Sequence, residues 1–417
     1  MSSEAGEAKP VERRFRAIYT CTPVAFHANR GFHIRDTGLI ARHLRLLGFE
    51  SKCIMPLPYY DDDTELDNLI RVEMEKLRDP SWWRSLGIEG VVLYSWAAPR
   101  YGAIARAIHR AGLWLLIHLD TSGNFWGDTW KTAGLFKKLE LCWRMPVTDF
   151  LRARHLRCAD VITTSPPVQE ILRHHYLYGA AIADKVQIMP CPVARECAYD
   201  GTPKEPLILF IGRWDDPEPK RPEYMMAALD ELFGSLSSEL PAGTKVEICG
   251  TLTPELRAWH AALPELVRAA ITLVGYVDNA LLPSFYNRAS VLGCPSRHES
   301  THIVSAEALC CGASVVAAAR PRDLAVVCWY TTRESGRVAA QDTPRSFAEA
   351  IRDELLVWQK GQRNPRHIAS SWQPVFHADL AMARILHLPA PRTTAPQSPH
   401  PAGESSEKRV AAESFVQ

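Results

Sequence analysis

Residues 289–318, ASVLGCPSRHESTHIVSAEALCCGASVVAA, carry the pattern that decides the fold. An apolar run at 289–295 is followed by a polar turn, a helix-like segment at 304–311 and a second apolar run at 314–318. Short apolar runs that alternate with helical segments are typical of βαβ units, in which the strands lie parallel. The stretch therefore predicts one strand–helix–strand crossover of a parallel sheet.

The same alternation continues on both sides of this stretch. Upstream, further strands are predicted at 206–211, 245–249 and 271–277. Helices are predicted between and after the strands, at about 221–238, 254–269, 281–288, 343–359 and 365–386. A chain in which strands and helices alternate in this way forms a doubly wound parallel sheet, so this half predicts one α/β domain.

The first half of the chain repeats the pattern before a break at about 195–206 that contains Pro and Lys. Its strands are predicted at 15–21, 51–55, 90–96, 113–119, 160–164 and 186–189, and its helices at 37–47, about 64–78, 104–111 and 167–176. We therefore predict an α/β protein with two Rossmann-like domains that face a cleft, at 15–195 and 196–388. Residues 1–14 are expected to be flexible, and residues 389–417, rich in Pro, Ser and Glu, to be disordered.

Composition limits the function classes. Apolar residues make up 47% of the 417 and charged residues 23%, and the net charge is +1, which argues against a protein whose main partner is nucleic acid. The eleven cysteines form no CxxC pair and lie mostly in apolar runs, as expected for reduced, buried thiols. The sequence shows no signal peptide and no apolar run of transmembrane length, so we expect a cytoplasmic protein with at most peripheral membrane contact.

Two carboxylates in the opening stretch are the first candidates for chemistry. Glu299 follows a strand and a short turn, and Glu307 lies inside the next helix. A loop that enters a helix offers free backbone N–H groups to a phosphate, and a carboxylate one or two turns further on can accept hydrogen bonds from sugar hydroxyls. The alternative is a helix cap and a solvated helix residue. The apolar setting of Glu307, IVSAEALCC, makes a carboxylate costly unless it has partners.

At this point the chain resembles the family 4 retaining glycosyltransferases of the GT-B fold, also called glycosyl transferases group 1. The resemblance rests on Glu299 and Glu307 with the ALCCG-ASVVA continuation, and on PLILFIGR at 206–213 followed by Lys220. It extends to the segments 159–165 (ADVITTS), 275–299 and 335–340 (SGRVAA). It covers roughly residues 15–385 and is specific in the C-terminal domain.

The resemblance implies a role for each matching residue. Arg213 and Lys220 match the family's basic pair, which neutralises the diphosphate of the donor as it departs. Glu307 matches the position that binds the donor ribose, and Glu299 the position near the transferred sugar and phosphate. His118 matches the histidine of the N-terminal domain beside the donor sugar. Gly31 stands where the family has its glycine-rich approach to the diphosphate.

Several positions depart from the family pattern or allow a second interpretation. The first loop reads Asn29-Arg30-Gly31-Phe32-His33 instead of carrying paired glycines, and His302 stands where the family usually has glycine. The cluster 61–63 (DDD) either holds a divalent metal on a nucleotide or begins a helix, and we prefer the second interpretation. Trp126 and Trp130 either stack on an acceptor or pack in the protein.

The resemblance implies an enzyme of EC 2.4 type that moves a sugar from a nucleotide-sugar donor to a hydroxyl of an unidentified sugar, lipid or small-molecule acceptor, with retention of configuration. The donor is expected on the C-terminal domain and the acceptor on the N-terminal one, with no metal or other cofactor. Two alternatives stay open: a metal-dependent transferase that uses Asp61–Asp63, and a non-catalytic relative that binds a sugar or nucleotide.

Overall fold

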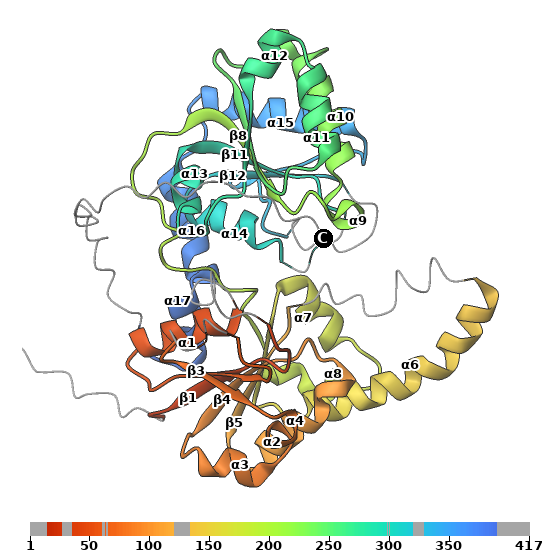
Figure 1. The fold of residues 1–417 in the computed structure, drawn as a ribbon, viewed down its shortest axis with the longest axis vertical. Helices are drawn as coiled ribbons and strands as arrows, with labels where there is room; N and C mark the ends of the chain where they lie inside the picture. The colour runs from red at the N-terminus through yellow and green to blue at the C-terminus, as the bar shows by residue number, and fades with distance from the viewer. Residues whose placement is uncertain are drawn as a thin grey trace, which may run out of the picture.

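The computed structural model describes residues 15–26, 36–60, 63, 66–120, 134–297, 299, 301–319 and 329–389. These residues form two α/β units, each built on one sheet whose strands are all parallel (Figure 1). The predicted fold class of two doubly wound domains is confirmed. The segments predicted to be flexible or disordered, 1–14 and 389–417, lie outside the described residues except for residue 389.

The first unit contains a seven-stranded sheet of order β3-β2-β1-β4-β5-β6-β7. Its strands are β1 Ile18–Cys21, β2 Cys53–Pro56, β3 Leu69–Val72, β4 Gly90–Tyr94, β5 Trp114–His118, β6 Val161–Thr164 and β7 Val186–Ile188. Its helices are α1 Asp36–Leu46, α2 Met74–Leu77, α3 Pro80–Ser85, η2 Pro99–Tyr101, α4 Gly102–Arg110, α6 Leu135–Leu156, α7 Pro166–Arg173, α8 Gly179–Ile182 and η3 Ala183–Lys185.

The second unit contains a six-stranded sheet of order β10-β9-β8-β11-β12-β13. Its strands are β8 Glu205–Gly212, β9 Lys245–Gly250, β10 Ile271–Gly275, β11 Ala289–Cys294, β12 Ser314–Ala317 and β13 Gly336–Val338. Its helices are α9 Pro217–Lys220, α10 Pro222–Phe233, η4 Ser237–Glu239, α11 Pro254–Ala262, α12 Glu265–Ala270, α13 Leu282–Arg288, α14 Ile303–Cys310, α15 Pro344–Gln359 and α16 Pro365–Phe376. A last helix, α17 Ala378–Ile385, follows.

Both sheets are buried on both faces, which explains the continuous apolar runs of their strands. In β4, Val91 and Leu93 pack in one core cluster, whereas Val92 and Tyr94 pack in another on the opposite face. Strand β8 divides in the same way, with Leu207 and Leu209 in one cluster and Ile208 and Phe210 in another. Successive side chains of a strand point to opposite faces, so each sheet separates two apolar layers.

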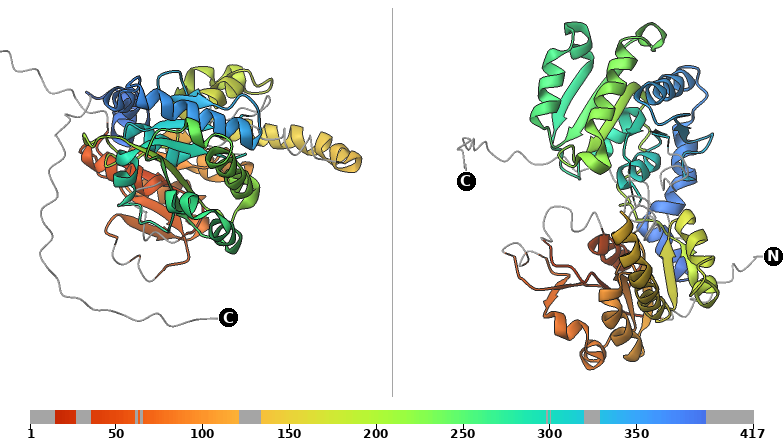
Figure 2. Two further views of the ribbon diagram at one scale, coloured as in Figure 1. Left: turned by 90° about the horizontal axis from the view of Figure 1, so that it is seen from above. Right: turned by 90° about the vertical axis from the view of Figure 1, so that its right-hand side faces the viewer.

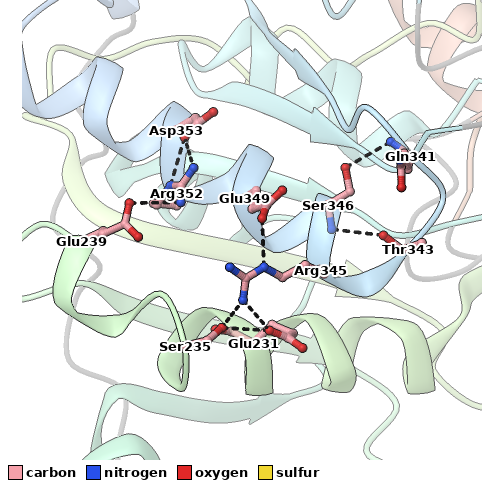
Figure 3. Close-up of polar contacts among 10 residues, drawn as sticks. All are labelled: Glu231, Ser235, Glu239, Gln341, Thr343, Arg345, Ser346, Glu349, Arg352 and Asp353. Atoms are coloured by element: carbon pink, nitrogen blue, oxygen red, sulfur yellow. Dashed lines mark hydrogen bonds and ion pairs between the residues drawn. The ribbon is translucent and has the colours of Figure 1, made fainter.

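Polar contacts fix helix α15 over the second sheet (Figure 3). The Thr343 side chain accepts a hydrogen bond from the Ser346 backbone N–H at 3.2 Å and so caps the start of α15. Arg345 binds Glu349 of its own helix and Glu231 of α10, each at 2.9 Å, and also contacts Ser235. These bonds join α15 to α10, and the two helices cover the same face of the sheet.

After α16 the chain returns to the first unit. Helix α17 lies beside α1 (Figure 1), and its Met382 and Ile385 share a core cluster with Ile40 and Leu44 of α1. The backbone also pairs where the chain crosses between the units: the Val193 N–H donates to the Phe376 carbonyl at 2.7 Å. The two sheets are therefore connected by two neighbouring segments.

Some predicted elements were wrong or missing. The expected helix at about 64–78 contains strand β3, because Leu69, Ile70 and Val72 pair with β2 and the charge of Arg71 is buried against Asp63 at 2.9 Å. The expected helix at 254–269 is two helices, and Pro264, which lacks an N–H, precedes the second. The long helix α6 and the short strand β13 were not predicted.

Gly293 provides a test of the packing between β11 and β8. A Cβ atom at Gly293 would overlap the ring of Phe210, which is fully buried. We expect Gly293→Ala to lower the free energy of unfolding by about 1–3 kcal/mol, the range found for overpacked cores. Urea denaturation measures this change. In the Phe210→Leu variant, Gly293→Ala should lower the free energy of unfolding by less than about half as much as it does in the wild type. An equal decrease in both proteins would show that the Phe210 ring is not the obstacle.

Candidate active site

A cavity of about 520 Å³ lies at the carboxyl ends of strands β8, β9 and β10. Ligands of doubly wound sheets bind at this edge, because the crossover loops diverge there. The first unit contributes Asp120, which follows β5, and the connecting segment contributes Cys191. The cavity therefore lies between the two units. From the second unit its walls include Ile211, Gly212, Arg213, Lys220, Cys249, Gly250, Thr251, Tyr276, Val277, Asn279, Leu282, Glu299, Thr301, His302, Ile303 and Val304.

Two glycines shape the floor of this cavity. Gly212 ends β8 and Gly250 ends β9, and the two residues pair in the sheet. Gly250 has φ +116°, and a Cβ atom there would overlap the carbonyl oxygen of Gly212. Only glycine suits that backbone conformation and that close approach, so the strand ends can lie side by side without filling the cavity.

An ion pair crosses the cavity wall. The Lys220 Nζ lies 2.6 Å from the Glu299 Oε1, and their side chains are 16% and 12% exposed. Lys220 is the last residue of α9, and the Arg297 N–H donates to the Pro219 carbonyl at 2.7 Å. This backbone bond holds α9 against the loop after β11. It thereby brings together two residues that the sequence places 79 positions apart.

The charges around Glu299 lower the pKa of its carboxyl group. Burial on its own raises that pKa, but the charges of His302 and Lys220 and the hydrogen bonds from Lys220 and Ser296 together outweigh burial. Arg213, by contrast, has a side chain that is 75% exposed and contacts Asp216 at 3.3 Å. The site thus contains one cation bound to a buried carboxylate and one that points into solvent.

His302 begins helix α14 in a left-handed conformation, with φ 52° and ψ 69°. Its Nδ1 lies 2.6 Å from the Ser305 hydroxyl, and its Nε2 lies 4.0 Å from the Glu299 Oε1. The left-handed region favours glycine, which is the residue that the resembled family usually has here. The imidazole therefore adds a polar wall to the cavity at a position where a glycine would leave space.

Glu307 lies deeper than the cavity lining. It is 2% exposed and accepts a hydrogen bond from the Tyr286 hydroxyl at 2.5 Å. The residues of α14 that line the cavity are Ile303 and Val304, at the start of the helix. The structure therefore gives Glu307 a buried hydrogen-bond partner, and its predicted contact with a donor ribose stays a prediction.

His118 is also fully buried, at the end of β5. Its Nδ1 lies 3.0 Å from the Thr163 hydroxyl, and its ring lies 4.4 Å from the ring of Tyr94. Burial lowers the pKa of His118 to about 3, so the imidazole is neutral at physiological pH. Asp120, two residues further along, lines the cavity instead. Asp120 was not among the predicted site residues, although it directly follows an apolar run whose carboxyl end faces the cleft.

Several predicted site residues lie outside the described part of the chain: Gly31, Asp61, Asp62, Trp126 and Trp130. Of the acidic cluster, Asp63 is described, and Arg71 binds it at 2.9 and 3.0 Å, so its carboxylate already has a buried cation as partner. Among the residues that the structure describes, no three His, Cys, Asp or Glu side chains are grouped to hold a metal ion.

Residues 205–356 match the sequence profile of the family glycosyl transferases group 1. The chain therefore carries a group 1 glycosyltransferase domain. This domain contains Arg213, Lys220, Glu299 and Glu307, the four predicted residues of the second unit. No curated protein sequence matches the chain significantly.

Solved glycosyltransferase structures share the fold of the whole chain. Anabaena HepE in complex with UDP aligns with a TM-score of 0.60 at 12% identity, over 89% of this chain and 99% of that one. Sucrose-phosphate synthase from Thermosynechococcus elongatus gives 0.56 at 16% identity, over 89% and 98%. A glycosyltransferase from Rickettsia africae gives 0.59 at 14% identity, over 89% and 97%.

These comparisons confirm the predicted enzyme class and the coarser part of the predicted recognition, a glycosyl transferases group 1 domain. The fold is GT-B, and the chain is a glycosyltransferase of EC 2.4 type. In the described residues, no helix is both long and apolar enough to cross a bilayer.

The Lys220–Glu299 pair predicts a pH dependence of stability. The pKa of Glu299 is lower in the folded protein than its usual value near 4.5, so the pair stabilises the fold fully above that value. This contribution is lost as pH falls through the lowered pKa. We expect the difference in unfolding free energy between the wild type and Glu299→Gln to be constant above pH 5 and to fall below about pH 4.5.

Lys220→Met should lower the free energy of unfolding by about 2–3 kcal/mol at neutral pH, because a buried carboxylate loses its cation. The loss of stability in acid that is expected for the wild type should shrink or disappear in this variant, because the pKa of Glu299 is less lowered without Lys220. Lys76→Met is the matched control: Lys76 lies 3.9 Å from Glu73 and is 53% exposed, so its loss should change stability by less than about 0.5 kcal/mol. Denaturant titrations across pH compare the variants, and equal costs of the two lysine substitutions would contradict the assignment.

Proposed function

We propose that this chain is a family 4 retaining glycosyltransferase that moves a sugar from a nucleotide-sugar donor to a hydroxyl acceptor. The observation that carries the proposal is the cavity between the two units. Arg213, Lys220 and Glu299 line its wall inside the group 1 domain, and Asp120 lines it from the other unit. A cleft with cations on one side and a separate unit on the other suits a charged donor and a second substrate.

A uridine diphosphate sugar is the first donor class to test. HepE has been solved in complex with UDP and with UDP-glucose, and its fold covers 89% of this chain. In this chain the diphosphate would contact Arg213 and Lys220 and the free N–H groups at the start of α14. Lys220 would then contact both Glu299 and the phosphate. Glu299 would thus be the group that positions the Lys220 side chain.

The chemistry follows from the charge that develops on the leaving group. The bond between the anomeric carbon and the phosphate oxygen breaks, and the nucleoside diphosphate departs with the electron pair. The acceptor oxygen bonds to the anomeric carbon on the same face, and its proton passes to the departing phosphate. Arg213 and Lys220 stabilise this leaving group electrostatically, and no step needs a metal ion.

The remaining roles rest on the family resemblance. His118 would lie beside the donor sugar, and as a neutral imidazole it acts there by hydrogen bonding and not as a charge. Glu307 would bind the ribose, and Gly31 would let the first loop approach the diphosphate. The acceptor would enter from the first unit, where Trp126 and Trp130 follow Asp120 in sequence.

Arg213 provides the decisive test of this proposal. With a UDP-sugar chosen by thermal shift, Arg213→Ala should reduce kcat/KM by about thirtyfold or more, because one cation opposite the leaving diphosphate is lost. EDTA should leave turnover unchanged, as should Asp62→Asn. Arg257→Ala, an exposed arginine of α11, is the matched control and should retain full activity. The rate of UDP release measures activity in each case. Full activity of Arg213→Ala, together with loss of wild-type activity in EDTA, would refute the proposal.

Glu307→Gln separates a donor contact from a purely structural role. If Glu307 binds the ribose, the affinity for UDP measured by calorimetry should fall about tenfold or more, because charge-assisted hydrogen bonds become neutral ones. Tyr286→Phe is the matched control, because it removes the hydroxyl that donates a hydrogen bond to Glu307 and leaves the carboxylate in place. Unchanged affinity in Glu307→Gln, with a loss of stability similar to that of Tyr286→Phe, would make Glu307 a structural residue.

A further inference from the structure

Helix α6, Leu135–Leu156, projects from the body of the first unit (Figure 1, Figure 2). Fourteen large apolar side chains are exposed among the described residues, and half of them belong to this one helix. Phe136 is 88% exposed and Trp143 84%. The others on the helix are Leu135, Leu139, Val147, Phe150 and Leu151. Concentrated exposure of this kind marks an interaction surface.

The exposed apolar side chains recur at helical spacing. Positions 136, 139, 143, 147 and 150 are three or four residues apart and so share one face of the helix. The opposite face carries Leu141, Ala153 and Leu156, which are buried, and the buried pair of Asp149 and Arg152 at 2.6 Å. Apart from Leu141, the buried residues of the helix all lie at 149–156, so its carboxyl-terminal part attaches it to the protein, and the earlier part presents an apolar face to solvent. We refer to the side chains at 136, 139, 143, 147 and 150 as the α6 outer face.

Positive charge flanks the α6 outer face. Lys137 and Arg144 lie on one side, Lys138 on the other, and Arg154 near its end, where its guanidinium is 6.0 Å from the Phe150 ring. The one acidic side chain on the exposed part of the helix is Glu140, which is bound by Lys137 at 2.7 Å and Arg144 at 2.6 Å. The exposed portion of the described helix therefore has a net positive charge.

We propose that the α6 outer face docks on the surface of an anionic lipid bilayer, a property that goes beyond the proposed sugar transfer. A helix with Trp, Phe and Leu on one face and Lys and Arg beside it is suited to the boundary between head groups and acyl chains. Its apolar side chains enter the acyl region, while the basic ones reach anionic head groups. No described helix, α6 included, is fit to span the membrane, which agrees with a helix that lies in the interface.

Charge favours lipid over a second copy of the chain on this face. An isologous dimer through α6 would bring the same basic flanks of two molecules together, and like charges at short range repel. An anionic bilayer offers the opposite charge along the whole length of the helix. At 1.5 Å per residue the 22 residues extend about 33 Å, so all five outer-face side chains can reach one flat surface.

Vesicle flotation tests the proposal with the full chain. We expect binding to vesicles of equal parts phosphatidylcholine and phosphatidylglycerol, and binding about tenfold weaker to phosphatidylcholine alone. The double variant Phe136→Glu/Trp143→Glu should weaken binding to the anionic vesicles about tenfold or more, since it places charges in the apolar face. Leu266→Glu is the matched control: Leu266 is 88% exposed on α12 of the other unit, and its substitution should change nothing.

Separate variants test the electrostatic contribution to vesicle binding. Lys137→Glu/Lys138→Glu/Arg144→Glu should also reduce binding about tenfold or more, whereas Lys360→Glu/Arg366→Glu, on exposed residues of the second unit, should not. If a variant fails to fold by circular dichroism, a fluorophore on the exposed Cys142 of the wild type reports insertion by a blue shift with anionic vesicles.

Two outcomes would overturn the proposal. The first is wild-type binding that Phe136→Glu/Trp143→Glu leaves unchanged. The second is absence of binding to anionic vesicles together with a dimer, detected by analytical ultracentrifugation, that the same substitutions dissociate; that result would assign the α6 outer face to a second copy of the chain.

Discussion

Among the described residues, two segments cross between the sheets, residues 189–196 and 376–378, and their backbones are hydrogen-bonded to each other. The Val193 N–H donates to the Phe376 carbonyl at 2.7 Å, and the Ala378 N–H donates to the Val193 carbonyl at 3.1 Å. Beyond this point α17 is anchored in the core of the first unit through Met382. Because both crossings are tied together, the carboxyl edges of the two sheets face each other, and the cavity between them depends on that arrangement.

Within this frame the distribution of charge decides what the cavity can bind. Lys220 is held by Glu299 at 2.6 Å, whereas Arg213 has a largely exposed side chain at the end of β8. A diphosphate would meet one exposed cation, Arg213, and one that Glu299 already orients, Lys220, so part of the cost of orienting the binding groups is met before the ligand arrives. His302 adds a constraint of its own, because its left-handed backbone places an imidazole where a glycine would leave room.

The first unit connects the cavity to the outer surface. Strand β5 ends at His118, Asp120 lines the cavity, and the chain then continues to α6, whose outer face is apolar and flanked by basic residues. The same unit that would hold the acceptor thus also carries the surface proposed to contact lipid. A protein docked through α6 would stay near any acceptor hydroxyl that is displayed at a bilayer surface.

The sequence by itself determined the two parallel sheets, since apolar runs alternating with helix-length segments permit few other architectures. The resemblance to the glycosyltransferases also pointed to Arg213, Lys220, Glu299 and Glu307, because the motifs that carry it are local in sequence. The sequence did not reveal β3, whose Arg71 is neutralised by Asp63, nor α6, which contains Pro146 and carries apolar side chains on both its exposed and its buried sides. Only the tertiary structure paired Lys220 with Glu299, brought Asp120 to the same cavity and buried His118 and Glu307. Such contacts arise from the packing of distant segments, and no local property of a sequence specifies which strand end meets which.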